Sequence, residues 1–416
     1  MYVLHGRRLL LGLIAVISIM ITLRGIPHRP VAGIPLSLER TISMRLDMLL
    51  SRRADAIVTG DAVALMSHYD LDSRYGQWAF EHEKRRCAYL QAWSAARGIR
   101  FLDTQVEFRI TSVELKGTTA WIELDESVKI CYKHDSQPES GSDSFGIGTE
   151  HLLELEFKDG EWVIRRDWYL DPLDVDASSV SSTTALGSSF ETYYSLSSDL
   201  VHPQLVAIPA SAYPWLYSSG NLSETGDEAD AKERAYLYNR ENAVAYANKY
   251  CGLAWGCGNN RRYNSAYKNY TGLGGDCTNF ASQILGDEEA GNLPMTYAWR
   301  YVPYGRAAGA TAAWAQASSL LSFLLSSGRA QRLARGTYAD LIAVSEAYPR
   351  GAIGALNRGD LIAYEEGGKI AHFAVVVGAD SGLYLLVNSH TADRYHVPWD
   401  LGWDSDTIFW LLKIVM

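Results

Sequence analysis

Hydrophobic positions in the first part of the chain change from a helical period to a period of two. Apolar residues recur at helical spacing from Ile42 to Ile57 and again around Trp93, which predicts two helices. Segments that alternate apolar and polar residues, as strands do, follow at 106–110, 118–124, 153–157 and 162–169. The dipeptide Asp159-Gly160 between the last two segments predicts a hairpin turn. Residues 40–172 are therefore expected to form an α+β accessory domain in which a curved antiparallel sheet wraps around a helix.

The polar residues of this accessory domain form no recognisable catalytic set. His82 and Glu83 lie on a charged face of the second predicted helix. We interpret that face as solvated surface, because charged side chains on a helix usually face water.

A change of composition separates the accessory domain from the rest of the chain. Between residues 173 and 229, serine pairs and prolines interrupt the pattern, which predicts a linker with some local structure. Acidic residues at 227–230 then open a helix that is expected to continue to Tyr250 and to begin the second domain, residues 230–416. Two domains and a linker also suit a length of 416 residues.

The N-terminal pattern is that of an export signal. Arg7-Arg8 precede an uncharged apolar run at residues 9–23, which is shorter than the roughly 20 residues that span a membrane. A basic flank followed by a short apolar core is typical of a secretory signal. Only residues 31–33 offer small side chains for cleavage, so residues 1–30 are expected to be a signal peptide or an uncleaved membrane anchor. The protein is predicted to be extracellular or held at the cell surface.

Charge and cysteine content narrow the classes of function. The formal net charge of −10, with no basic patch after the N-terminus, argues against nucleic acid as a partner. In an exported chain, five cysteines fit two disulfides and one free thiol. Cys251 and Cys257 are close enough in sequence to pair across a tight loop, and their spacing is not that of a C-x-x-C motif. No metal site and no cofactor are therefore expected.

One cysteine stands at a predicted helix start. Gly274-Gly275 end a loop, Asp276 suits the cap position, and the helix is expected to begin at or near Cys277. The field at a helix N-terminus favours thiolate, the nucleophilic form of cysteine. The alternative, a buried structural cysteine, remains open on this signal alone.

A nucleophilic cysteine needs a base and a group that orients the base. His372 opens a predicted strand whose partner strand includes Asn388. A three-residue hairpin loop at 380–382 places His390 directly opposite His372, whereas a four-residue loop places Ser389 there. Asn388 is the second candidate for the orienting group, because it lies on the same strand face as His390.

Several segments in the second half match a known family in their expected order. They are Tyr238-Asn239-Arg240, Gly275-Asp276-Cys277-Thr278-Asn279-Phe280, Gly359-Asp360, Ala371-His372 and His390-Thr391. Residues 236 to 414 thereby resemble the putative amidase domain family, which is similar to the papain-like cell-wall hydrolases of the CHAP and Nlp type. The accessory domain resembles, more loosely, the partner domain that often precedes this amidase in Gram-positive bacteria.

The resemblance implies a fold and a set of roles. The fold is papain-like, with an N-terminal helix bundle packed on an antiparallel sheet. Cys277 is implied as nucleophile and His372 as base, with His390 at the third position and with Asp276 and Asn279 supporting the helix start. The sequence thus predicts an exported cysteine amidase or peptidase whose substrate is a peptide or a peptidoglycan-like amide. A non-catalytic extracellular binding protein and an acyl transferase remain as alternatives.

Overall fold

The structure, a computed structural model, describes residues 36–136, 141–173, 238–271, 276–303 and 309–415. The chain divides into two compact units, residues 1–44 and 45–416, and each is described by itself. Of the first unit, the structure describes only residues 36–44, which begin helix α2 (Leu36–Thr59). The apolar run at 9–23 and the linker from residue 174 onward lie outside the described residues. Within the described ranges, no helix is long and apolar enough to cross a membrane.

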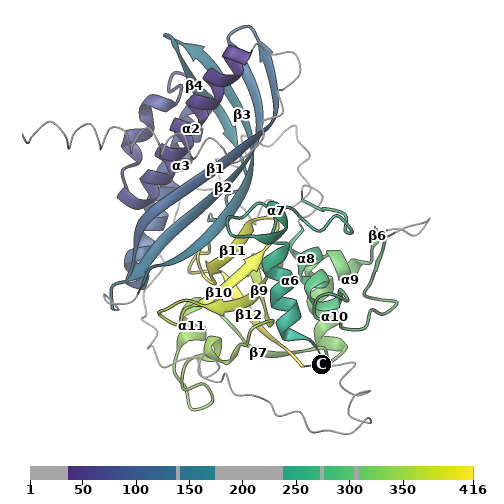
Figure 1. Cartoon of the computed structure of the whole chain (residues 1–416). Coiled ribbons are helices and arrows are strands. Elements are labelled where there is room, and N and C mark those ends of the chain that lie inside the picture. Colours follow the sequence, from purple (N-terminus) through teal and green to yellow (C-terminus); the bar gives the residue numbers. More distant parts are fainter. Residues whose placement is uncertain (1–35, 137–140, 174–237, 272–275, 304–308, 416) are drawn as a thin grey trace, which may run out of the picture. The chain divides into compact units, whose positions relative to one another are not determined.

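The first half of the second unit contains helices followed by a long antiparallel meander (Figure 1). After α2 come the 3-10 helix η1 (Ala62–His68), α3 (Arg74–Arg97), β1 (Ile99–Lys116), β2 (Thr119–His134), β3 (Asp143–Lys158) and β4 (Glu161–Trp168). Helix α3 ends because Gly98 adopts a left-handed conformation with φ 59° and turns the chain into β1. The hairpin predicted at Asp159-Gly160 is confirmed, since Lys158 pairs with Glu161 and both turn residues have positive φ.

The second half of this unit places helices before most of its strands. The helices are α6 (Arg240–Lys249), α7 (Gly258–Arg261), α8 (Cys277–Gly286), α9 (Ala312–Ala315), α10 (Ala317–Ser326), α11 (Tyr338–Ile342) and the 3-10 helix η4 (Ala352–Ala355). The strands are β5 (Tyr301–Val302), β6 (Gly309–Ala310), β7 (Ala330–Gly336), β8 (Leu361–Glu366), β9 (Lys369–Ala379), β10 (Leu385–Ser389), β11 (Asp393–Pro398) and β12 (Ile408–Ile414). The α+β fold class predicted from the sequence is confirmed.

In the part of the chain that the structure describes, ten strands from both halves form one sheet, and β5 and β6 form a separate two-stranded sheet. The order is β1-β2-β3-β11-β10-β9-β8-β12-β7, with β4 paired to β3. The link between the halves is the antiparallel pairing of β3 with β11, in which Gly146 faces Tyr395 and Gly148 faces Asp393. Residues 45–416 thus form one compact unit, and the division into an accessory and a C-terminal domain stays a prediction.

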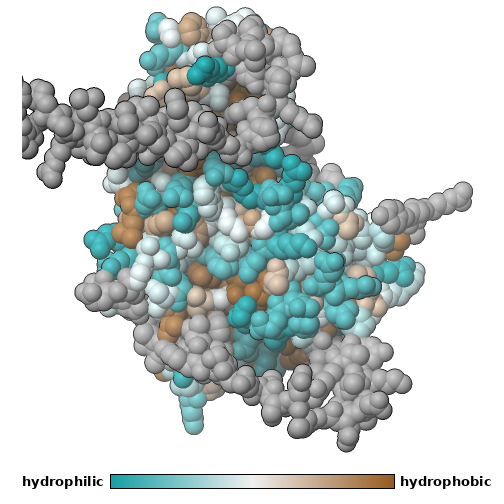
Figure 2. Space-filling view, in the orientation of Figure 1, coloured by the Kyte–Doolittle hydropathy of each residue, from teal (hydrophilic) through white to brown (hydrophobic). Residues whose placement is uncertain are grey.

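Alternate residues of the C-terminal strands pack into two different cores. Phe373 and Val375 face a core formed with Phe280 of α8 and with residues of α6 and α10, the helices grouped beside these strands in Figure 1. Ala374 and Val376 face the other core, formed with the region of α11 and η4. This alternation decides which side of the sheet each site residue can reach. The molecular face in Figure 2 is mostly hydrophilic, with hydrophobic residues in small, separate patches.

Candidate functional site

The helix start predicted at Cys277 is present. Helix α8 begins at Cys277, with Asp276 at the cap position. The Cys277 side chain is buried, with 5% of the residue exposed, and its sulfur lies 3.7 Å from the Thr278 hydroxyl. The glycine pair that precedes Asp276 lies outside the described residues.

The Cys277 sulfur lies beside a part of strand β9 that is not paired with β10. Strand β10 pairs with β9 only from Val375 to Ala379, so it ends before it reaches His372 and Phe373. On the other side, Phe373 is paired with a residue of β8. The backbone N–H of Phe373 donates a hydrogen bond to the Cys277 sulfur. The sulfur therefore lies at the unpaired edge of β9, beside the residue that follows His372.

Burial opposes the thiolate at Cys277. It raises the pKa of the Cys277 thiol, and the hydrogen bonds from Phe373 and Thr278 offset only part of this rise. The sequence-based expectation of an acidified thiol is therefore wrong for this arrangement. The helix field favours the thiolate by only about 1 kcal/mol, which is less than the cost of removing the charge from water.

The backbone N–H of Cys277 is not free for a substrate oxygen. It donates to the hydroxyl oxygen of Thr391 at 3.1 Å, and the N–H of Asp276 donates to the same oxygen. Thr391 has a φ of 74°, which is rare for a β-branched residue. A strained residue thus accepts from the first N–H donors of α8, the groups that would otherwise be available to an oxyanion.

His372 lies in β9 on the face opposite to Phe373. Its ring packs 5.6 Å from that of Tyr364 and 5.6 Å from that of Trp403. The residue is 2% exposed, and its Nε2 has no hydrogen-bond partner. Burial lowers the pKa of His372 well below its usual value, and the neighbouring Arg394 and His390 add to this effect. In the described part of the chain no hydrogen bond joins His372 to Cys277, and both groups are uncharged in this arrangement.

The strand register differs from both registers considered for His390. Asn388 pairs with Val375, whereas a register with His390 opposite His372 would pair Asn388 with Ala374. The connection between β9 and β10 spans residues 380–384 and is longer than the three or four residues expected. A shift of one residue moves every side chain to the other face, so the predicted facing of His372 and His390 is wrong.

His390 instead joins two backbone segments around the helix start. Its Nδ1 lies 2.7 Å from a carboxylate oxygen of Asp276, and its Nε2 lies 2.5 Å from the carbonyl oxygen of Tyr250. The imidazole also stacks on Phe280, with ring centroids 3.7 Å apart. Since both ring nitrogens face acceptors, they can donate together only as imidazolium. The ring fixes Asp276 and does not contact His372.

Asp276 and Asn279 form the polar support of the helix start. The second carboxylate oxygen of Asp276 accepts from the Asn279 side chain at 2.7 Å and from the backbone N–H of Tyr270 at 2.9 Å. The Asn279 amide oxygen accepts from the Trp314 indole at 2.8 Å. Asn388, the second candidate for orienting the base, bonds to Ala247 and Asn248 and does not reach His372.

The cysteines form one disulfide in the described chain, and the expected second pair is absent from it. Cys251 and Cys257 are joined, while Cys87, Cys131 and Cys277 are free thiols. The disulfide loop packs on β3. A Cβ atom at Gly146 would lie 1.9 Å from the Trp255 carbonyl oxygen, so only glycine fits there.

One group of side chains has the composition of a metal site. His134, Asp143 and Asp380 offer ligand atoms within 4.8 Å of one another. Their oxygens already have protein partners, because Asp380 accepts from Tyr132 and from His134 at 2.8 Å, and Asp143 accepts from the hairpin at Ser381. The donor set therefore fits a polar joint between β-hairpins better than it fits a metal.

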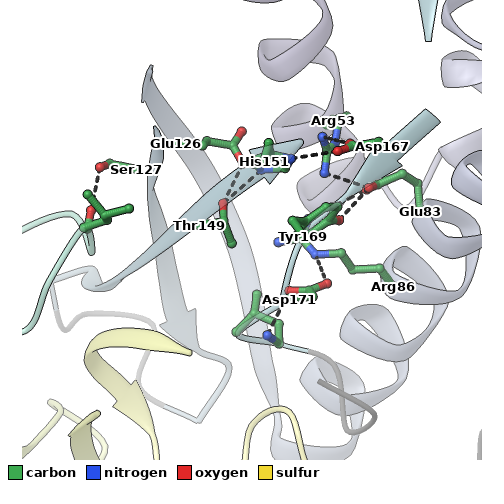
Figure 3. Close-up of polar contacts among 12 residues, drawn as sticks. Arg53, Glu83, Arg86, Glu126, Ser127, Thr149, His151, Asp167, Tyr169 and Asp171 are labelled. Atoms are coloured by element: carbon green, nitrogen blue, oxygen red, sulfur yellow. Dashed lines mark hydrogen bonds and ion pairs between the residues drawn. The ribbon is translucent and has the colours of Figure 1, made fainter. Parts of the chain in front are cut away.

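A buried ionic network lies in the first half of the unit, where the sequence indicated no polar site (Figure 3). Its members are Arg53, Glu83, Arg86, Glu126, His151, Asp167, Tyr169 and Asp171. The interpretation of His82 and Glu83 as solvated surface is wrong, since these residues are 5% and 1% exposed. From the sequence alone, charged residues on one helix face are interpreted as solvated, because their partners cannot be identified. Here Glu83 pairs with Arg53 of α2, and His82 lies beside Asp171, which follows β4.

The contacts inside the network are short and reciprocal. Arg53 pairs with Glu83 at 2.7 Å and with Asp167 at 2.9 Å. The His151 ring lies between Asp167 at 2.9 Å and Glu126 at 3.1 Å. The network thus ties α2 and α3 to the strands that follow them, which makes it a part of the core.

Comparison with known proteins confirms the resemblance in the second half of the chain. A family model described as a putative amidase domain matches residues 237–412. The uncharacterized protein YhbB of Bacillus subtilis (strain 168) is 34% identical over 194 residues, which are 43% of this chain and 50% of YhbB. The chain thus spans about half the length of this curated relative. Residues 237–412 are thus similar to a putative amidase domain.

Two similar solved structures each cover less than a third of the chain. The intermembrane space region of the chloroplast protein ARC6 is 19% identical, covers 31% of this chain and 94% of its own, and gives a TM-score of 0.23. A structure described as a putative NTF2-like transpeptidase from Campylobacter jejuni is also 19% identical, covers 28% of this chain and 94% of its own, and gives 0.18. At these TM-scores neither similarity supports a conclusion.

Proposed function

We propose that this protein hydrolyses amide bonds with Cys277 as nucleophile and His372 as base. The observation that carries the proposal is the hydrogen bond from the Phe373 N–H to the Cys277 sulfur, at the unpaired edge of β9. This contact places Cys277, the first residue of α8, next to Phe373, which directly follows His372 in β9. Both residues fall in the region that matches the putative amidase domain.

The proposed reaction proceeds in two halves. The Cys277 thiol gives its proton to His372, and its sulfur attacks the amide carbonyl to form a tetrahedral oxyanion. The imidazolium then returns the proton to the leaving amine as the carbon–nitrogen bond breaks and a thioester remains. Water, deprotonated by His372, hydrolyses the thioester and restores the thiol.

The closed arrangement requires an opening step before this chemistry. Cys277 and His372 are 5% and 2% exposed, so substrate cannot reach them without movement. The N–H of Cys277 donates to Thr391, and this hydroxyl must leave before the N–H can bind an oxyanion. Loss of one oxyanion donor lowers the rate of such reactions on the order of 100- to 1000-fold. Displacing the Thr391 hydroxyl from the Cys277 N–H therefore frees a donor that speeds the reaction.

His390 takes a positioning role in this proposal. Its bonds to Asp276 and to the Tyr250 carbonyl fix the residue that caps α8, and thereby the location of Cys277. The orienting role that the resemblance implied for His390 would require a contact with His372 that this arrangement lacks.

The proposed substrate and location follow from features outside the site. The basic and apolar N-terminal sequence supports export, with residues 9–23 as a signal or a tether. The disulfide between Cys251 and Cys257 supports an oxidising compartment. An exported amidase of this kind is proposed to act on peptides of the cell wall.

Thiol labelling tests the cysteine–histidine pair without knowledge of the substrate. Iodoacetamide is applied from pH 4 to 9, and labelling at each cysteine is measured by mass spectrometry. The free thiols provide internal references: Cys131 is partly exposed, and Cys87 is buried with a pKa raised to about 12 by burial. We expect Cys277 to be labelled through the open form faster than Cys87, and more slowly after His372→Ala. If the rate of Cys277 labelling is the same with and without His372, the proposal that the two residues act as nucleophile and base is contradicted.

Activity on isolated cell-wall fragments tests the hydrolase itself. Release of new amino groups should stop in Cys277→Ala and fall strongly in His372→Ala. Full activity of Cys277→Ala ends the proposal. Added amines that appear in the product would instead indicate acyl transfer, which uses the same thioester.

A binding protein on a hydrolase scaffold is the second candidate. The observation that favours it is the burial of both Cys277 and His372 in uncharged form. A protein that binds wall fragments but releases no amine, and whose Cys277 resists iodoacetamide as Cys87 does, fits this alternative.

A further inference from the structure

Arg394 is a buried cation that has no counter-ion among the described residues. It lies in β11 and is 2% exposed. Its Nε and Nη1 atoms have no hydrogen-bond partner, and no carboxylate among the described residues forms an ion pair with it. An unpaired charge in a protein interior is strongly unfavourable, and buried arginines are normally bonded to carboxylates or carbonyls.

The surroundings of Arg394 offset little of this cost. Its guanidinium carbon lies 5.4 Å from the centre of the Trp403 ring, a distance that gives a modest cation–π attraction. Of the carboxylates, Asp171 exerts an attraction on it, but Asp171 lies 2.6 Å from Arg86, which already balances its charge. Burial accordingly lowers the pKa of Arg394.

Arg394 and His372 flank the same indole. The Trp403 ring lies 5.6 Å from the His372 ring and 5.4 Å from the Arg394 guanidinium. Two more buried nitrogens here have no partner, Nε2 of His372 and Nε1 of Trp403. Arg394 and Trp403 thus present unused N–H donors near the proposed base, and no acceptor of the described chain satisfies them.

We propose that Arg394 is the specificity residue of the site and binds a carboxylate of the substrate near the amide that is cleaved. This inference rests on the proposed function, because it assumes that substrate reaches His372. A guanidinium can hold a carboxylate through two parallel hydrogen bonds. A single guanidinium balances one negative charge, which suits a carboxylate, whereas a phosphate dianion would leave a buried negative charge uncompensated. The substrate class is therefore a peptide amide that carries an acidic side chain or a free carboxyl terminus.

The stability of a variant separates this role from a structural one. Arg394→Met removes the unpaired charge and keeps much of the aliphatic volume. We expect its Tm to be equal to or higher than that of the parent protein. Arg329→Met is the matched control, since Arg329 is also buried and forms no ion pair among the described residues, but it differs in donating to the Pro294 carbonyl at 2.7 Å. The control should lower the Tm, because it leaves that carbonyl unpaired. A lower Tm for Arg394→Met assigns Arg394 to the structure of the protein and overturns the proposal.

Binding is measured in the full chain carrying Cys277→Ala, so that turnover plays no part. The probes are N-acetylated tripeptides, each as the free acid and as the carboxamide, followed by NMR titration. We expect the free acids to bind at least about tenfold more tightly, and Arg394→Met to abolish this difference while Arg329→Met keeps it. Equal binding of the two forms, or binding of neither, overturns the proposal.

The two proposals fail in different ways. If the wild-type protein cleaves acid and carboxamide substrates equally well, the hydrolase stands and the Arg394 subsite fails. If Cys277→Ala retains the preference for acids but the wild-type protein shows no turnover, the subsite stands and the hydrolase fails.

Discussion

Replacing His151 by glutamine should reveal the electrostatic contribution of the buried ionic network. The His151 side chain is fully buried and lies between Asp167 at 2.9 Å and Glu126 at 3.1 Å. Burial acts to lower the pKa of His151, but the charge and hydrogen bond of Asp167, followed by those of Glu126, outweigh burial and raise the pKa to about 9. The ring is therefore an imidazolium at neutral pH, bonded to two carboxylates.

The magnitude follows from the difference between the folded and unfolded pKa. The ordinary value is 6.5 and the folded value is about 9. One pKa unit corresponds to about 1.4 kcal/mol, so the charged form contributes on the order of 3 kcal/mol to the free energy of unfolding. Because the folded pKa is the higher one, this contribution is complete below pH 6.5 and is lost as the pH rises through about 9.

Urea unfolding of wild-type protein and His151→Gln at pH 6, 8 and 10 measures this contribution. At pH 6 the variant should be less stable by about 3–5 kcal/mol, because the buried Glu126 loses its ion-pair partner and Asp167 keeps only its pairing with Arg53. The difference should shrink by about 3 kcal/mol by pH 10, where the wild-type ring is neutral. The control is His68→Gln, since burial lowers the pKa of His68 and its effect should not change above pH 7. A stability difference for His151→Gln that stays constant from pH 6 to 10 would refute the reasoning.

Three further substitutions test local features. Cys251→Ser should lower the free energy of unfolding by about 2 kcal/mol under non-reducing conditions, as expected for a loop with a sequence separation of 6, and added reductant should remove the difference from wild type. Thr391→Val should cost about 1–3 kcal/mol in urea unfolding, because two helix-start N–H groups lose their acceptor, while Thr391→Ser should stay close to wild type. Gly252→Ala should lower the free energy of unfolding by about 2 kcal/mol or more. Glycine at this position has a φ of 75°, and a Cβ atom would lie 2.2 Å from a carboxylate oxygen of Asp393. A thermal unfolding transition unchanged from wild type would contradict this steric argument.

The pairing of β9 with β10 shows how small an error of register is needed to change a proposed site. The sequence placed His390 on the strand beside His372, and both residues are buried near the start of α8. The connecting loop is longer than the pattern indicated, and the register moves by one residue. His390 therefore bonds to Asp276, and Thr391, which no pattern singled out as a donor or acceptor, takes the N–H of Cys277.

Local rules in the sequence determined the elements of this protein. Period and turn chemistry predicted the meander and its hairpin at Asp159-Gly160, and the glycine pair with Asp276 predicted the helix that begins at Cys277. These features depend on interactions between residues a few positions apart, so they can be read from the chain. The family resemblance of residues 236 to 414 likewise followed from short motifs in order, and the family model matches residues 237–412.

Only the tertiary structure decided the electrostatics and the partners. Glu83 was interpreted as solvated, although it is buried with Arg53, a residue of another helix. Burial, and not the helix field, sets the direction of the shift in the Cys277 pKa. Whether Arg394 finds a partner among the described residues depends on what packs around β11. The free energy of a charge depends on its distance from water and from other charges, and these distances are fixed by residues more than 100 positions apart in the chain, as for Arg53 and Asp167.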